Sequence, residues 1–231
     1  MVLGWWHEER AGIGIATSYG LSTIPSDLYN NATVYAGFPR EISPARIPKR
    51  KPLENKVYVA LFLSDGDNIQ YCEHTMCRLW DNPRRGTFPI NWTVSPGLAE
   101  LGPGLLNYYY DTASEQDCLV SGPSGMGYSL IYDELNDIWH TSKRETIEEY
   151  TKLTDRYLKK SGIRIITIWD RVNQEQMEAY ADNCRHLIGV TLEDWKRAPK
   201  IEASSSNGRL AFIGNRPCYT SYVEDMFREW E

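Results

Sequence analysis

Short apolar runs rich in β-branched and aromatic residues alternate with helical patterns along the 231-residue chain. Most of these runs are apolar at nearly every position, which is typical of parallel strands covered on both faces. The pattern predicts strands at residues 12–18, 33–37, 56–64, 90–95, 118–122, 164–169, 187–192 and 209–214. Their alternation with helices indicates repeated βα units.

The clearest predicted helix covers residues 143–160, and Gly162 follows it where a helix usually ends. Its apolar residues recur at helical spacing, at Ile147, Tyr150, Leu153, Tyr157 and Leu158. Residues 173–184 and 221–230 are two further predicted helices. We therefore expect an α/β fold: a (β/α) barrel-like domain, irregular or incompletely closed, with predominantly parallel strands.

A proline-rich segment divides the chain. Residues 38–55 contain several prolines and little periodicity, which is typical of a linker. The predicted organisation is an N-terminal βα segment at residues 1–37 that packs on the main domain, a linker at 38–55, and an α/β barrel-type domain at 56–231.

Composition and charge narrow the classes of function. Hydrophobic residues make up 42% of the chain and charged residues 24%, as in ordinary globular domains. The net charge is −6 and no broad Lys/Arg cluster occurs, so we expect no nucleic-acid partner. No apolar run approaches the ~18 residues of a membrane span, and the start lacks a basic-then-apolar export signal. The chain as given is expected to be soluble, and a secreted or periplasmic location would require a signal that was trimmed.

The cysteines and histidines do not predict a metal site. Five cysteines are scattered and odd in number, which favours reduced, buried thiols. The histidines, His7, His74, His140 and His186, are dispersed and form no pair at helical spacing. We expect neither a metal nor a cofactor, and the sequence does not indicate the oligomeric state.

Polar, acidic and small residues collect directly after successive predicted strands. They are Asp65, Asp67 and Asn68; Ser95; Ser124, Gly125, Gly127 and Tyr128; Asp170; Glu193, Asp194 and Trp195; and Asn215. In parallel α/β folds the carboxyl ends of the strands lie on one face, where ligands bind. Carboxylates and amides hydrogen-bond hydroxyl groups and aromatic rings stack on sugar rings, so this face suits a carbohydrate.

Three blocks of sequence resemble a known family. They read "LSDGDNIQY" at residues 63–71, "PINWTVSPGLAELGPGLLNYYY" at 89–110 and "GPSGMGY" at 122–128. In this order they resemble the GxGYxYP family of putative glycoside hydrolases, found largely in gut bacteria. The motif letters match at Gly125, Gly127 and Tyr128, whereas Leu130 and Ile131 replace the second tyrosine and the proline. The resemblance implies a barrel-type fold and a carbohydrate substrate.

Glycoside hydrolysis requires two carboxyl groups, one acting as acid and the other as base or nucleophile. We predict Asp67 and Glu193 as this pair, with Asp65 and Asp170 tuning their charge or holding hydroxyl groups. The predicted substrate-binding residues are Asn68, Trp92, Ser95, Ser124, Gly125, Gly127, Tyr128, Trp195 and Asn215.

Several of these residues also have a purely structural interpretation. In "SDGDN" at residues 64–68, Asp67 or Asn68 could cap a helix while Gly66 supplies a special dihedral angle. Trp92 could pack in the core, and the glycines of residues 122–128 could form a plain tight turn. The alternative functions are a non-catalytic carbohydrate-binding protein and a metal-dependent carbohydrate deacetylase.

Overall fold

The computed structural model describes residues 4, 6–39, 41–45, 52–131, 143–169, 171–193, 201–204 and 208–215. Its centre is a single sheet with the strand order β1-β2-β3-β4-β5-β7-β6. The strands are β1 (Phe62–Leu63), β2 (Ile90–Val94), β3 (Asp117–Ser121), β4 (Ile165–Trp169), β5 (Gly189–Glu193), β6 (Ile201–Ser204) and β7 (Ala211–Gly214). All neighbours pair in parallel except β6 and β7, which are antiparallel. The six parallel strands form a curled half-barrel, which confirms the expected incomplete barrel.

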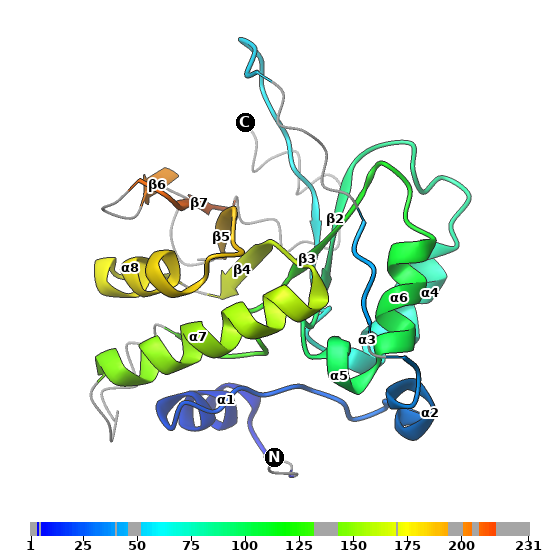
Figure 1. Cartoon of the computed structure of the whole chain (residues 1–231), viewed down its shortest axis with the longest axis horizontal. Coiled ribbons are helices and arrows are strands. Elements are labelled where there is room, and N and C mark those ends of the chain that lie inside the picture. The colour runs from blue at the N-terminus through cyan, green and yellow to red at the C-terminus, as the bar shows by residue number, and fades with distance from the viewer. Residues whose placement is uncertain are drawn as a thin grey trace.

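Helices flank this sheet. They are α1 (Glu9–Ser18), α2 (Ala32–Ala36), α3 (Ile69–Glu73), α4 (Thr75–Trp80), α5 (Leu98–Leu101), α6 (Pro103–Asp111), α7 (Lys143–Ser161) and α8 (Gln174–Asn183). In Figure 1, α7 and α8 lie to the left of β2 and β3, the group α3 to α6 lies to the right, and α1 lies below α7. None of the helices in the described part of the chain is long and apolar enough to cross a membrane.

The two central predicted helices are confirmed. Helix α7 buries Ile147, Tyr150 and Leu158 along one face. It ends at Ser161, and the next residue, Gly162, has a φ of 76°, in the left-handed region that glycine tolerates. Helix α8 begins with a capping box in which Asn173 accepts from the backbone of Gln176 at 2.9 Å. The predicted helix at 221–230 lies outside the described residues.

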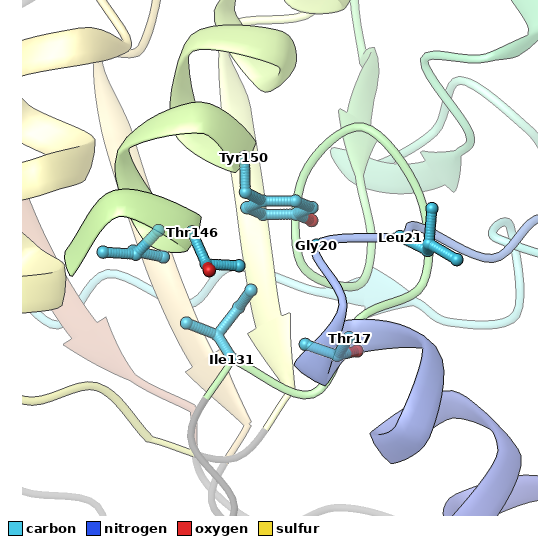
Figure 2. Close-up of a pocket in the computed structure, with 7 residues that line it drawn as sticks. Thr17, Gly20, Leu21, Ile131, Thr146 and Tyr150 are labelled. Atoms are coloured by element: carbon cyan, nitrogen blue, oxygen red, sulfur yellow. The ribbon is translucent and has the colours of Figure 1, made fainter. Parts of the chain in front are cut away.

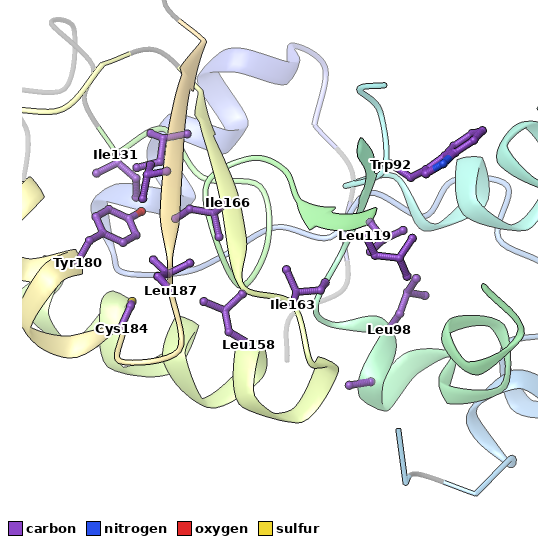
Figure 3. Packing of buried hydrophobic residues seen from close by; sticks show 14 of the residues in the cluster. Trp92, Leu98, Leu119, Ile131, Leu158, Ile163, Ile166, Tyr180, Cys184 and Leu187 are labelled. Atoms are coloured by element: carbon purple, nitrogen blue, oxygen red, sulfur yellow. The ribbon is translucent and has the colours of Figure 1, made fainter. Parts of the chain in front are cut away.

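The main core is formed by side chains of the strands and of helices α3 to α8. Figure 3 shows it extending from Trp92 at one end to Tyr180 and Cys184 at the other. Trp92 is 2% exposed, and its ring centroid lies 5.0 Å from that of Trp80. The Trp92 indole donates a hydrogen bond of 2.8 Å to Asp117 at the start of β3, which also binds Arg85 at 2.5 Å. Trp92 therefore packs in the core, and the polar network around Asp117 supports the amino-terminal end of the sheet.

The two predicted N-terminal strands are wrong, because residues 12–18 lie in α1 and residues 33–37 lie at α2. Ile13 is 1% exposed and Ile15 is 62% exposed, and exposed positions recur at residues 11, 15 and 19, which is the spacing of a helix. The Glu8 carboxylate accepts hydrogen bonds from the first backbone N–H groups of α1 and so starts a helix. A Cβ at Gly12 would lie 2.1 Å from the Trp6 ring, so glycine permits close packing on this helix.

The predicted strand at residues 56–64 is much shorter than expected, because only Phe62 and Leu63 pair with β2. Val57 is 89% exposed, and β1 is an edge strand of the described sheet. Strand β6 was not predicted, since its four residues, IEAS, carry no strong apolar pattern. The strands predicted near residues 90–95, 118–122, 164–169, 187–192 and 209–214 are confirmed as β2, β3, β4, β5 and β7.

Candidate active site

The loop after β1 is tied closely to β2. The Thr93 hydroxyl donates to the backbone oxygen of Leu63 at 2.6 Å and accepts from the backbone N–H of Gly66 at 2.9 Å. A Cβ on Gly66 would lie 1.6 Å from the Thr93 carbonyl oxygen, so only glycine fits. The left-handed backbone angle belongs to Asp65, with φ of 72°, and not to Gly66. The alternative in which Gly66 supplies the special dihedral angle is therefore wrong.

Asp67 is a buried carboxyl group at the end of this loop. Its residue is 7% exposed, and burial is the main reason that its pKa rises from 3.8 to about 7. Hydrogen bonds from the backbone N–H groups of Asp67 and Asn68 act against this rise, while the negative charges of Asp65 and Glu9 add to it. A substantial fraction of Asp67 consequently carries a proton at neutral pH.

Glu193 brings a second carboxyl group to the same region from the end of β5. Burial raises the pKa of Glu193, and the negative charge of Asp65 raises it further. Strands β1 and β5 are separated by three strands in the sheet order, so this influence reflects the curl of the half-barrel. We call Asp65, Asp67 and Glu193 the carboxylate cluster. Asp65 is its exposed member and interacts electrostatically with both of the others.

An aromatic pair stands next to the carboxylate cluster. The rings of Tyr128 and Trp169 stack with centroids 5.2 Å apart and an interplanar angle of 23°. Tyr128 is 3% exposed, whereas Trp169, at the end of β4, is only partly buried. Burial raises the pKa of Tyr128, and the nearby charges of Glu9 and Asp67 raise it further. Tyr128 thus packs behind Trp169 and lies close enough to Asp67 for the two groups to interact electrostatically.

The serine of the loop at residues 122–128 serves the loop itself. Ser124 is fully buried, and its hydroxyl donates to the Ser129 backbone oxygen at 2.8 Å. The same hydroxyl accepts from the Trp169 backbone N–H at 3.1 Å. The Tyr180 hydroxyl donates to the Ser124 carbonyl oxygen at 2.7 Å. Ser124 therefore positions the end of β4, where Trp169 stands, through hydrogen bonds within the protein.

The glycines of this loop approach the protein's own atoms. A Cβ on Gly125 would lie 2.7 Å from the Thr154 hydroxyl of α7, and one on Gly127 would lie 2.8 Å from the Thr23 carbonyl oxygen. The φ of Gly125 is 150°, which side chains rarely adopt. These contacts account for both glycines by packing within the chain.

The other predicted binding residues occupy less open positions. Ser95 is fully buried and accepts from the Gly97 backbone N–H at 3.2 Å, and Trp92 lies in the core. Asn68 stands at the N-cap position of α3 without making a side-chain capping bond. Asn215 follows β7, and its backbone N–H donates to the Leu192 oxygen at 2.7 Å. The remaining candidates, Asp170, Asp194 and Trp195, lie outside the described residues.

Glu9 is a residue that the sequence interpretation missed. It lies in the first turn of α1, and its charge acts on both Asp67 and Tyr128. The available signal was the acidic pair in "HEER", because acidic residues favour the first turn of a helix. Even with that signal, the sequence does not tell which loop the helix packs against.

A small pocket lies between α1 and α7. Figure 2 shows Thr17, Gly20, Leu21, Ile131, Thr146 and Tyr150 around it. Its volume of about 10 Å³ has room for about one water molecule, so it does not hold a sugar. A larger hollow between α7 and α8 is lined mostly by charged residues. Within the described ranges, no three His, Cys, Asp or Glu side chains are grouped so that they could hold a metal ion.

Comparisons with known proteins agree with this architecture. The model of the GxGYxYP putative glycoside hydrolase C-terminal domain matches residues 55–214. Among solved structures, the chain is similar to a putative hydrolase from Bacteroides thetaiotaomicron, with 26% sequence identity and a TM-score of 0.76. The similarity covers 89% of this chain and 40% of that one, so the chain spans less than half the length of that hydrolase. A comparison with curated proteins gives no match. Because the family model covers more than half of the sequence, the chain belongs to the GxGYxYP family of putative glycoside hydrolases.

Proposed function

We propose that this protein hydrolyses a glycosidic bond with Asp67 as the general acid and Glu193 as the second carboxyl group. The observation that carries the proposal is the burial of Asp67, which is 7% exposed in the loop after β1; burial and neighbouring negative charge raise its pKa to about 7. A general acid must hold its proton at working pH and release it to the leaving group, which a pKa near neutrality favours. The family to which the chain belongs supports the same class of reaction.

The roles follow from the charge of each group. Protonated Asp67 gives its proton to the glycosidic oxygen as the bond between that oxygen and the sugar breaks. Glu193 acts on the anomeric carbon, either directly as a nucleophile or by activating water. In the overall reaction the oxygen of water bonds to the anomeric carbon, and its proton passes to Asp67 in the retaining mechanism or to Glu193 in the inverting one, after which exchange with solvent restores both groups. The negative charge of Asp65 raises the pKa of both groups, which favours the protonated form of Asp67, whereas Glu193 must be ionised to act.

The substrate class is supported by the aromatic pair. Trp169 is partly exposed at the end of β4, and its ring stacks on the buried Tyr128. An indole face held from behind is a rigid surface on which the apolar face of a sugar ring can pack. Hydrogen bonds from the sugar hydroxyl groups to Asp65 and Asn68 would then fix the orientation of the ring.

A glycan-panel assay on the purified chain tests the proposal, with product release and binding recorded on the same samples. We expect the native chain to release product from at least one glycan and Asp67→Asn to release none. Asn keeps the size and one hydrogen-bonding oxygen of Asp67 but has no acidic proton to transfer. The control is Asp27→Asn, the same chemical change at an exposed position, which should retain full activity.

Two outcomes decide against the proposal. Product release by Asp67→Asn at the native rate would remove Asp67 as the acid. Binding of a glycan without any product release by the native chain would instead favour a carbohydrate-binding protein. Where product is released, the anomeric configuration of the first product, read by proton NMR, assigns Glu193 as nucleophile or as base.

A further inference from the structure

The segment that leads into β1 is apolar and stands in solvent. Every residue from 52 to 61 is exposed, and Val57, Tyr58 and Val59 are 89%, 55% and 60% exposed. In Figure 1 this segment is the cyan stretch that extends away from the sheet and the helices before it reaches β1. Single exposed apolar residues are ordinary, but a continuous apolar stretch is typical of a surface that another chain covers.

The backbone of this segment is also unpaired. None of the described residues forms a hydrogen bond with the backbone N–H or C=O groups of residues 57–60. Pairing with β2 begins at Leu61, whose carbonyl oxygen accepts from the Asn91 backbone N–H at 2.9 Å. Backbone groups alternate in direction along a strand, so those of Leu61 face β2 and those of Ala60 and Phe62 face outward. We call residues 57–63 the open edge.

We propose that the open edge pairs with the open edge of a second copy of this chain, antiparallel, with a two-fold axis at Leu61. Ala60 then lies opposite Phe62 of the second copy. Because the backbone groups of both residues face outward, each such pair exchanges two hydrogen bonds. Leu61 lies opposite Leu61 of the second copy, at a position where side chains approach most closely. The two sheets are thereby joined through β1, whether or not the chain is a hydrolase.

This register places apolar side chains opposite apolar side chains. Val59 lies opposite Leu63 of the second copy on the face that carries Leu61, and Ala60 lies opposite Phe62 on the other face. Cross-strand pairs between aliphatic, β-branched and aromatic side chains stabilise a sheet. The open edge is therefore complementary to itself, as an interface with two-fold symmetry requires.

The charges favour the same direction and register. Lys56 is the only charged residue from position 55 to position 64. In a parallel pair the two Lys56 side chains would lie side by side, whereas in the antiparallel pair they lie about 34 Å apart at ~3.4 Å per residue. Each Lys56 instead lies opposite Gly66 of the second copy, beside the exposed Asp65, so opposite charges meet. An axis at Val59 would place Lys56 opposite Phe62.

The area is sufficient for a dimer. The exposed surface of the open edge amounts to on the order of 500 Å² on each copy, so a pair buries about 1,000 Å². Specific interfaces begin at about this size, and a standard one buries ~1,600 Å². We therefore expect a reversible dimer. An edge strand left open is a template for pairing with another chain, and the two-fold axis closes it after one partner.

Sedimentation velocity of the full chain, from low to high micromolar concentration, tests the pairing. We expect a monomer–dimer equilibrium in the native chain. Val59→Lys should raise the dissociation constant on the order of a hundredfold, because the axis repeats at two positions a change worth about tenfold at each. Val34→Lys is the matched control, since Val34 is 58% exposed but lies on α2, and it should leave the dissociation constant unchanged.

Leu61→Cys reports the register separately from the affinity. At the two-fold axis the two new thiols lie close enough to form a disulfide, with copper phenanthroline and oxygen as the oxidant. We expect a cross-linked dimer on a non-reducing gel. Val34→Cys carries the same native cysteines and should cross-link no more than the native chain.

Three results would overturn the pairing. The first is a chain that stays monomeric at the highest concentration without a cross-link through Leu61→Cys, which would leave a different chain as the partner of the open edge. The second is a dimer that Val59→Lys and Val34→Lys weaken equally. The third is an open series of larger oligomers, because a two-fold axis at Leu61 permits only a pair.

Discussion

Replacing Asp67 by asparagine should stabilise the protein at neutral and alkaline pH. The pKa of Asp67 is about 7 in the folded protein and 3.8 as an unperturbed group. Its contribution to stability is therefore fully present below the lower value and is lost as the pH rises through the folded value. Above that pH the folded state must hold a buried negative charge, and the amide removes this charge.

The size of the effect follows from the shift. About three pKa units at ~1.4 kcal/mol each give a cost of about 4 kcal/mol for ionising Asp67 in the folded state. The amide is itself polar and loses some hydration on burial, a cost of ~1–3 kcal/mol that reduces the gain. We expect Asp67→Asn to raise the free energy of unfolding by about 1–3 kcal/mol at about pH 8. At ~2–4 °C per kcal/mol for a chain of this size, the melting temperature should rise by several degrees.

Thermal and urea unfolding of both proteins between about pH 4 and pH 9 measures this difference. The stability gain of Asp67→Asn should be small near pH 4, grow between about pH 4 and 7, and be constant above that range. Asp27→Asn, at an exposed site, should stay within ~0.5 kcal/mol of the native chain throughout. A gain that does not vary with pH, or a loss of stability at pH 8, would refute the electrostatic reasoning about Asp67.

Further substitutions test the roles of residues at the carboxyl and amino ends of the strands. In Asp65→Asn the new asparagine can adopt the left-handed backbone found at this position. Loss of the negative charge should lower the pKa of Asp67 and move the alkaline limb of the pH profile of kcat/KM to lower pH. A limb that does not move would contradict the assigned interaction between the two charges. Asp117→Asn removes the charge that pairs with Arg85 and one of the two acceptor oxygens at the start of β3. It should cost about 3 kcal/mol in urea unfolding, with kcat/KM of the folded fraction unchanged. Gly66→Ala has no room beside the Thr93 carbonyl oxygen and should lower the melting temperature strongly; near-native melting would show that the loop can shift.

The sequence predicts the central strands well because their signal is local. Strands β2, β3, β4 and β5 each contain apolar, mostly β-branched or aromatic residues, and each buries three consecutive residues, so both faces of the sheet are covered. The N-terminal runs at residues 12–18 and 33–37 also contain apolar and β-branched residues. Helix α1 nevertheless forms there, supported by the Glu8 cap and by the close approach of Trp6 to Gly12. A contact between a side chain and a glycine several residues away overrides local strand preference. Periodicity alone therefore predicts the central strands and fails for the N-terminal segment.

The candidate site can likewise be predicted only where the signal in the sequence is local. Asp67 and Glu193 could be proposed from sequence, because parallel strands bring their carboxyl ends to one face regardless of side-chain detail. Which of the two keeps a proton depends on burial and on charges that arrive from distant segments, Asp65 across the curl and Glu9 from α1. Glu9 and Tyr128 are more than a hundred positions apart, and no spacing rule links them. Strand ends thus determine where the carboxyl groups lie, while burial within the folded chain is the main reason that the pKa of Asp67 rises.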